Sequence, residues 1–237
     1  MKAVFVSFRR FLGGVLDDYM LTACLLMPII MGAAFRFGIP ALEEYLCGTF
    51  SQQSVLAPYY LVFDLVIAVM TPMMFSFSGV MTMLEELDNG TARYLMVTPI
   101  GKTGYLASRI GITSAVSVLY STAAIAVFGI SEMSLPMNIA VSVLCAVTGV
   151  IVSVFVVAFA GNKVEGMALI KLSGIIILGI PAVFFLPVPL KYIACILPSY
   201  WFTEMSRRGS YLYAAPALLT SAVWLIPIYK KFAGKLV

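Results

Sequence analysis

The chain has 237 residues, of which 62% are hydrophobic and only 11% are charged, and its mean hydropathy is +1.02. An average soluble domain is about 45–50% apolar and about 25% charged, so a water-soluble fold of this size lacks the polar surface to cover so many apolar side chains. The composition therefore predicts an integral membrane protein. The net charge of +4, without a concentrated basic patch, argues against nucleic acid as a partner.

Catalytic and metal-binding chemistry has little support. Histidine is absent, which removes the commonest general base and the commonest metal ligand. The four cysteines show neither a CxxC pair nor a metal-binding spacing, and no nucleophile stands beside a base. We therefore expect no catalytic residue, no metal ligand and no cofactor bound by this chain, and we do not expect an enzyme.

Residues 1–18 are predicted to form a short amphipathic helix in the plane of the membrane. Arg9 and Arg10 stand beside apolar residues that recur near helical spacing, a pattern typical of interfacial helices. These apolar residues are Val4, Phe5, Phe8, Phe11, Leu12 and Leu16. The two arginines interrupt the apolar stretch and no small-residue cleavage site follows, so the segment does not resemble a cleavable signal. A frayed cytosolic tail is the alternative.

Six apolar runs then follow, each long enough to cross a bilayer, which takes about 20 helical residues. They cover residues 19–37, 57–84, 106–130, 138–161, 167–186 and 210–229. We therefore expect an all-α membrane protein in which residues 1–237 form one transmembrane domain with six spans. An even number of spans puts both termini on the same side of the membrane.

The placement of the basic residues predicts which side that is. If the N-terminus is cytoplasmic, eleven lysines and arginines fall on the inside and four, Arg36, Lys191, Arg207 and Arg208, fall outside. Cytoplasmic loops carry such an excess of positive charge. The sequence therefore predicts a multi-pass protein of the cell membrane with both termini in the cytoplasm.

The segment between the fifth and sixth spans stays apolar. Residues 190–197 are too short to span a membrane, and Pro189 and Pro198 flank them. We interpret them as a re-entrant or interfacial helix on the outer side. An apolar extracellular loop packed on the bundle is the alternative.

The link between the second and third spans is the most informative segment. The acidic residues Glu85, Glu86 and Asp88 close one helix, and the Asn89-Gly90 pair predicts a turn. Thr91 is expected to cap a short amphipathic helix that ends before Pro99. Such a helix, held below the membrane, would let a soluble protein push on both attached spans. An ordinary solvated connector is the alternative.

This link resembles that of the ABC-2 type transporter permeases. Their pattern places two acidic residues before Gly-Thr, then a hydrophobic helix and Thr-Pro, and the run from Glu86 to Thr91 followed by Leu95, Thr98 and Pro99 fits it. Asp88 stands where glutamate is usual, and Ala92-Arg93 where a leucine–acidic pair is common. The run 161–166 and the Pro-Ser-Tyr-Trp turn at 198–201 extend the resemblance over essentially the whole chain.

The resemblance implies a permease subunit of an ATP-driven ABC transporter, an exporter by family analogy. It works as a dimer with a second permease subunit, the same or homologous, and with cytosolic ATPase subunits that hold the ATP and Mg²⁺. The link between spans two and three would be the ATPase-coupling loop, made of Glu85, Glu86, Asp88, Gly90, Thr91, Arg93, Tyr94, Leu95, Thr98 and Pro99. Gly101-Lys102-Thr103 is not a phosphate-binding loop, because Met96 stands where that motif needs glycine.

Three further residues are candidate sites. Asp64 lies about two turns inside the second span, where an ionisable side chain is a candidate for a functional polar site, with Arg36 as a conceivable partner. Cys47 and Cys195 are both predicted outside, where they could form a disulfide or remain two unrelated thiols. A stand-alone channel or secondary carrier is the alternative function, although such proteins usually carry more charges at mid-membrane.

Overall fold

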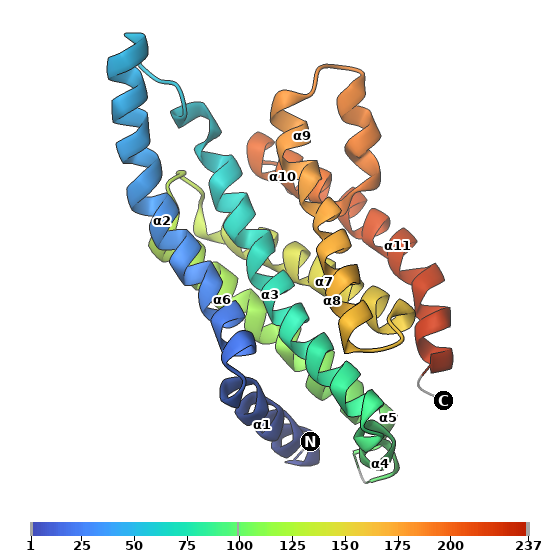
Figure 1. Cartoon of the computed structure of the whole chain (residues 1–237). Coiled ribbons are helices and arrows are strands. Elements are labelled where there is room, and N and C mark those ends of the chain that lie inside the picture. The colour runs from blue at the N-terminus through green and yellow to red at the C-terminus, as the bar shows by residue number, and fades with distance from the viewer. Residues whose placement is uncertain (1, 99, 236–237) are drawn as a thin grey trace.

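The computed structural model describes residues 2–98 and 100–235, and all the secondary structure in these ranges is helical. Six helices are long and apolar enough to cross a membrane, which confirms the predicted fold class. Both ends of the chain lie at the same end of the bundle (Figure 1). We call this the terminal end; it also holds α4 and the loop at 160–162. The distal end holds the loops at 51–56 and 129–134.

The helix α1 (Lys2–Asp17) precedes the bundle and turns away from the next helix at Asp18 (Figure 1). Phe11 and Val15 are buried on its inner face, while Phe5 and Leu16 are exposed. The carboxylate of Asp18 accepts the backbone N–H groups that begin α2, which fixes the break between the two helices. The amphipathic helix predicted for residues 1–18 is therefore present.

The helix α2 (Tyr19–Phe50) is longer than predicted, because residues 38–50 continue the helix in spite of Pro40. The carboxylate of Glu43 explains how the chain then returns. It accepts backbone N–H groups from Val55, Leu56 and Ala57, with N–O distances of 2.9, 2.5 and 3.3 Å. Pro40 removes one helical hydrogen bond, but a proline does not by itself end a helix when other contacts support both sides.

The next two spans form a hairpin that crosses the bundle. A short 3₁₀ turn, η1 (Ala57–Tyr59), leads into α3 (Tyr60–Asp88), and the small helix α4 (Thr91–Val97) follows at the terminal end. The third span is one continuous helix made of α5 (Gly101–Leu106), the π-helical turn η2 (Ala107–Gly111) and α6 (Ile112–Phe128). It begins five residues earlier than predicted.

The remaining spans are α7 (Leu135–Phe159), the broken helix from α8 (Lys163–Ser173) through the 3₁₀ segment η3 (Gly174–Leu178) to α9 (Gly179–Phe185), and α11 (Ala214–Lys235). The 3₁₀ turn η5 (Tyr211–Tyr213) precedes α11. These bounds differ from the predicted ones by a few residues, mostly where polar residues continue a helix.

Two short helices, not one, connect α9 to α11. They are the 3₁₀ helix η4 (Leu190–Ile196) and α10 (Pro198–Arg208), and together they return from the top of the bundle toward its middle (Figure 1). Pro198 occupies the first turn of α10, where a missing N–H costs nothing. The predicted re-entrant segment thus continues for eleven residues beyond its expected end.

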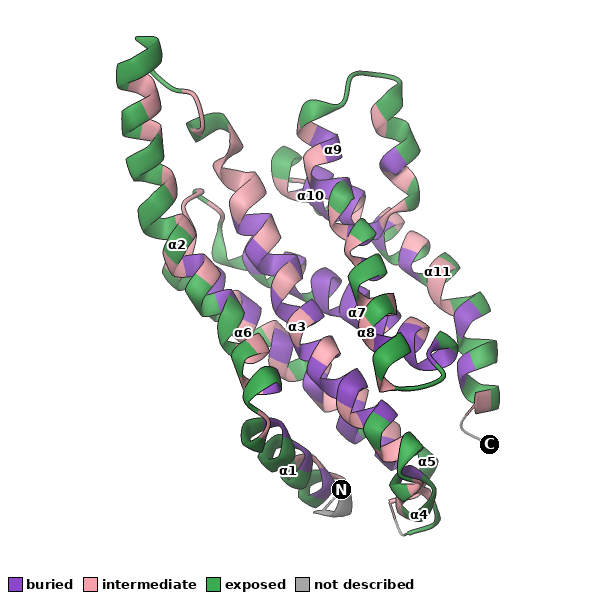
Figure 2. Cartoon of the chain, in the orientation of Figure 1, coloured by how far each residue is buried: buried purple, intermediate pink, exposed green. Residues whose placement is uncertain are grey.

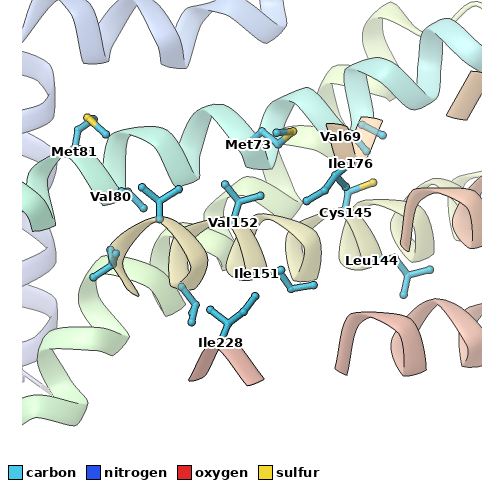
Figure 3. Close-up of a cluster of buried hydrophobic side chains, with 14 of the residues drawn as sticks. Val69, Met73, Val80, Met81, Leu144, Cys145, Ile151, Val152, Ile176 and Ile228 are labelled. Carbon is cyan, nitrogen blue, oxygen red and sulfur yellow. The ribbon is translucent and has the colours of Figure 1, made fainter. Parts of the chain in front are cut away.

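The core lies where α3 and α7 cross (Figure 2). Figure 3 shows Val69, Met73 and Val80 of α3 facing Cys145 and Val152 of α7. A hydrogen bond of 2.8 Å from the Ser76 hydroxyl to the Gly149 carbonyl links the same two helices. In a membrane, such polar contacts between small residues hold helices together. In contrast, α2 and α11 flank the bundle and leave most of their apolar side chains exposed.

Candidate functional site

The helix α4 lies at the terminal end and connects α3 to α5 (Figure 1). Gly90 precedes it with φ at 72°, a left-handed conformation that glycine adopts without strain, so the Asn89-Gly90 turn is confirmed. Thr91 is the first helical residue and not the cap, because the cap position is taken by Gly90, and no side chain caps the helix. The predicted capping role of Thr91 is therefore wrong.

The exposed side of α4 carries apolar side chains. Tyr94 is 76% exposed and Val97 is 84% exposed, while Ala92 is fully buried against the bundle. Arg93 and Thr98 are also exposed, and Leu95 is half-buried. Pro99 lies outside the described residues. The helix thus has one face fixed to the spans and one face free to meet another molecule.

The three acidic residues at the end of α3 contact different parts of the bundle. Glu86 forms a bidentate ion pair with Arg109 of η2, with distances of 2.5 Å from Nη2 to Oε1 and 3.1 Å from Nε to Oε2. Glu85 pairs with the ammonium group of Lys163 at 2.7 Å, and Asp88 accepts the backbone N–H of Lys163 at 3.2 Å. The acidic cluster therefore joins α3 to the third span and to α8.

Arg109 is the centre of a buried network that the sequence analysis missed. Its side chain is only 4% exposed, and it donates to the backbone carbonyl of Ser7 in α1 at 3.2 Å. The guanidinium group lies 5.0 Å from the ring centre of Phe11, and the Tyr105 hydroxyl donates to Glu86 at 2.8 Å. Arg109 thus ties α1, α3 and the third span together. The signal in the sequence that could have predicted this network is the position of Arg109, a charged residue inside an apolar run.

Local backbone geometry brings Arg109 close to α3. The π-helical turn at 107–111 places one extra residue in the helix, and such turns often occur at functional sites. A Cβ atom on Gly79 of α3 would lie 2.9 Å from the Arg109 carbonyl oxygen, so only glycine permits this approach.

A cavity of about 1160 Å³ opens beside this network. Its walls come from α1, the start of α2, the end of α3, α4 with the residues just after it, and η2. They include Phe11, Asp17, Glu86, Leu95 and Arg109. Drug-sized ligands occupy pockets of roughly 300–1,000 Å³. The cavity is therefore large enough for a small molecule, and its walls are both apolar and charged.

Asp64 is fully buried, and its carboxylate contacts the loop between α6 and α7. It accepts the backbone N–H groups of Ile130 and Ser131 at 3.0 and 2.8 Å, and it also accepts the Ser131 hydroxyl. Arg36 donates to the carbonyl of Gly129 in the same loop at 2.7 Å. Asp64 and Arg36 therefore both hold the 129–131 loop. These contacts account for the burial of Asp64, and a role in transport stays a prediction.

All four cysteines are described and all are free, so no bridge joins Cys47 to Cys195 in this structure. Cys47 lies in the distal extension of α2 and Cys195 in η4, on opposite flanks of the bundle (Figure 1). No group of three or more possible metal ligands occurs in the described part of the chain.

A second charged cluster lies on α10. Glu204 is 1% exposed and receives hydrogen bonds from Arg207 and Arg208, the latter at 2.7 Å from Nε. Burial opposes ionisation of Glu204, but the two guanidinium groups outweigh that effect and hold the pKa of its carboxyl below the usual value. The ammonium group of Lys191 in η4 lies 3.9 Å away. This cluster fixes α10 to η4.

Comparison with known proteins gives one family. The model of the family described as "Rv2686c-like: Fluoroquinolones export permease protein Rv2686c-like" matches residues 11–229. Two relatives are the fluoroquinolones export permease proteins Rv2686c and MT2760 of Mycobacterium tuberculosis, strains ATCC 25618 / H37Rv and CDC 1551 / Oshkosh. Each is 23% identical over 236 residues, which cover 96% of this chain and 92% of the relative. No solved structure matches significantly.

These matches agree with the six helices that are long and apolar enough to cross a membrane. The family match spans all six membrane helices and includes the link that carries α4. The relatives are named as permeases, so transport across a membrane, not catalysis, is the role that the family points to. The chain is a multi-pass membrane protein that belongs to the Rv2686c-like family of permeases.

Proposed function

We propose that this chain is the membrane-spanning permease subunit of an ATP-driven exporter of the ABC-2 type. In this proposal two permease subunits enclose the substrate path, and separate ATPase subunits bind ATP and Mg²⁺ in the cytosol. The protein lies in the cell membrane, and its terminal end faces the cytosol. The relatives' names support an export role, and the basic residues near the terminal end support this orientation.

The observation that carries the proposal is the exposed apolar face of α4. Tyr94 and Val97 lie at the terminal end, outside the spans, and neither is covered by other described parts of the chain. Aromatic residues and arginine are enriched where proteins contact one another, and Arg93 is exposed beside these two residues. A soluble ATPase subunit that binds this face would cover it.

The network around Arg109 supports a mechanical role for α4. Because Glu86 at the end of α3 is paired with Arg109 in the third span, a force on α4 acts on both spans together. The same arginine holds α1 through Ser7. Movement of the ATPase would therefore move α1, α3 and the third span together. Because α3 packs against α7 in the core, a tilt of α3 would also displace α7.

The flanking helices support the proposed dimer. Large apolar side chains are exposed along α2 and α11, among them Ile30, Phe37, Leu219 and Val223. One such face would meet the second permease subunit, and lipid would cover the rest. The cargo is proposed by analogy with the relatives, whose names specify fluoroquinolones. A small amphipathic molecule is therefore the first cargo to test.

The decisive experiment replaces residues on the free face of α4. We expect Tyr94→Glu and Val97→Glu to abolish co-purification of the ATPase subunit and ATP-driven transport, while the melting temperature stays within about 2 °C, because both side chains are exposed. The control is Val188→Glu, a similarly exposed residue near the opposite end of the bundle.

Transport itself is measured as fluoroquinolone uptake into inverted membrane vesicles. We expect uptake to require ATP and to be unaffected by dissipation of ion gradients. Intact ATPase association in both α4 variants would contradict the coupling role. Uptake driven by an ion gradient without ATP would instead establish a secondary carrier.

A further inference from the structure

A groove of about 190 Å³ lies between α8 and α11, which both pack against α7. We call it the α8–α11 groove. Ile151 and Val152 of α7, both labelled in Figure 3, form its buried floor. Leu172 of α8 and Ile175 of η3 form one wall, and Trp224 of α11 forms the other. The groove therefore separates two spans that share α7 as a neighbour.

The surface of the α8–α11 groove is apolar. Its two polar side-chain groups are already used, because the Ser173 hydroxyl donates to the Ile170 carbonyl at 2.6 Å and the Trp224 indole N–H donates to the Ile196 carbonyl at 2.8 Å. An apolar cavity of roughly 150 Å³ holds one benzene ring, so this groove has room for part of an acyl chain. Ile175 is 57% exposed, and the groove is therefore open to the surrounding bilayer.

A cation stands at the end of the groove that faces the terminal end of the bundle. Trp224, Ile228 and Lys231 follow one another on one face of α11, at intervals of four and three residues. Lys231 is thus about 10 Å closer to the terminal end than Trp224. Its ammonium group lies 3.8 Å from the ring centre of Phe159, which in turn packs against Phe155 of the groove with ring centres 5.2 Å apart.

Positive charge is in excess at this end of the groove. Lys231 and Lys171 are exposed, and neither forms an ion pair with a described residue. Lys171 precedes the wall residue Leu172, and side chains on α8 lean toward its N-terminus, which lies at the terminal end. The nearby carboxylate of Glu165 accepts the backbone N–H of Gly161 at 2.6 Å. The two lysines therefore remain available to an anion at the membrane surface.

We propose that the α8–α11 groove binds one molecule of an anionic phospholipid. One acyl chain lies on the apolar floor, and the phosphate group lies at the membrane surface beside Lys231 and Lys171. Basic pockets between membrane helices hold anionic headgroups in this way, and lysine side chains near the end of a span extend to the surface. The bound lipid would join α8 to α11. The proposal does not depend on ATP coupling.

The test measures lipid binding to the full chain by native mass spectrometry. The protein is delipidated by repeated exchange into an uncharged detergent and is then titrated with phosphatidylglycerol or with phosphatidylcholine of identical acyl chains. We expect one phosphatidylglycerol molecule to bind at least about 10-fold more tightly than phosphatidylcholine, because each lysine near the headgroup contributes about 1 kcal/mol.

The headgroup contact is tested with two neighbouring lysines. Lys231→Gln should weaken phosphatidylglycerol binding by about 5-fold and leave phosphatidylcholine binding unchanged. Lys231→Arg should restore it. Lys230→Gln is the matched control, because Lys230 is also exposed on α11 but lies on the face of Ile226 and not on that of Trp224. It should change binding by less than about 2-fold.

The acyl-chain contact is tested by filling the groove. Ile175→Trp places an indole ring in it and should weaken the binding of both lipids by at least about 10-fold. Leu178→Trp is the control, since Leu178 also belongs to η3, is 58% exposed and does not line the groove. Neither variant removes a buried side chain, so both should fold.

Thermal unfolding gives a second readout that a structural role of these residues would not give. Phosphatidylglycerol should raise the melting temperature of the parent chain and of the Lys230→Gln and Leu178→Trp variants by about 5 °C. It should have little effect on Ile175→Trp, although the melting temperature without lipid stays within about 2 °C of that of the parent chain.

Three results would overturn the proposal. The first is equal binding of the two lipids by the parent chain, and the second is phosphatidylglycerol binding that survives Ile175→Trp. The third is a loss of self-association in Ile175→Trp without a change in lipid binding, which would identify the groove as a contact between two copies of the chain. Each result would leave ATPase association through α4 unaffected, so this proposal and the proposed function fail separately.

Discussion

The two ends of the bundle use their carboxylates in different ways. At the terminal end Glu85 and Glu86 pair with cations on other helices, Lys163 and Arg109. At the distal end Glu43 and Asp64 instead accept backbone N–H groups of loops. Neither Glu43 nor Asp64 forms an ion pair with a described residue.

This difference indicates what each end is built to do. A carboxylate that accepts two or three backbone N–H groups fixes a loop in one conformation. A pair of charged side chains joins two helices, but the helices can move apart and the side chains can then pair with other groups. At the terminal end, where the ATPase is proposed to bind, Glu85 and Glu86 thus join helices through pairs of side chains, beside the backbone N–H that Asp88 accepts. At the distal end Glu43 and Asp64 hold loops through backbone N–H groups.

The largest expected effect tests the buried pair at the terminal end. Arg109→Met leaves the Glu86 carboxylate, which is 16% exposed, with the Tyr105 hydroxyl as its one remaining partner among the described residues. We expect a loss of about 3–5 kcal/mol in the free energy of unfolding, because an uncompensated charge remains buried. Reversible unfolding in one detergent measures it. The double variant Arg109→Met, Glu86→Gln should recover most of the loss, and a double variant as unstable as the single one would contradict this reasoning.

A smaller effect is expected for the loop contacts of the distal end. Asp64→Ala removes a fully buried carboxylate that accepts the half-buried N–H groups of Ile130 and Ser131, and we expect a loss of about 2–3 kcal/mol. Glu43→Ala should cost only about 1 kcal/mol, because the Glu43 carboxylate is half-buried and water can take its place. Hydrogen–deuterium exchange should rise at 130–131 in the first variant and at 55–57 in the second. Exchange that rises throughout the bundle instead would show that the carboxylates do more than hold these loops.

The smallest effect belongs to the exposed pair. Glu85 is 54% exposed in its contact with Lys163, so Glu85→Gln should change the free energy of unfolding by less than about 1 kcal/mol. Raising the salt concentration should remove the difference from the parent chain. A loss as large as that of Arg109→Met would mean that the whole acidic cluster, and not the buried pair alone, holds the terminal end.

Local patterns in the sequence were sufficient to predict the class and the outline of the protein. Apolar runs of about 20 residues are long enough to cross a bilayer, and a helix forms all the backbone hydrogen bonds of such a segment internally. The six spans and the short amphipathic helix at the start could therefore be predicted from local pattern alone. The turn at Asn89-Gly90 and the short helix after it were also local, because glycine adopts a left-handed conformation there. The end of α2 was misplaced, since the contact that fixes it joins Glu43 to residues 55–57.

The pairing of the charged residues, in contrast, depends on how the helices pack. Arg109 is 23 positions from Glu86 and 102 positions from Ser7, and no local pattern shows that the three meet. The cavity of about 1160 Å³ at the terminal end is likewise formed by residues of α1, α3, α4 and the third span that are far apart in the sequence. The pattern of apolar residues is local and is visible in the sequence. A specific ion pair or cavity instead depends on which helices pack side by side.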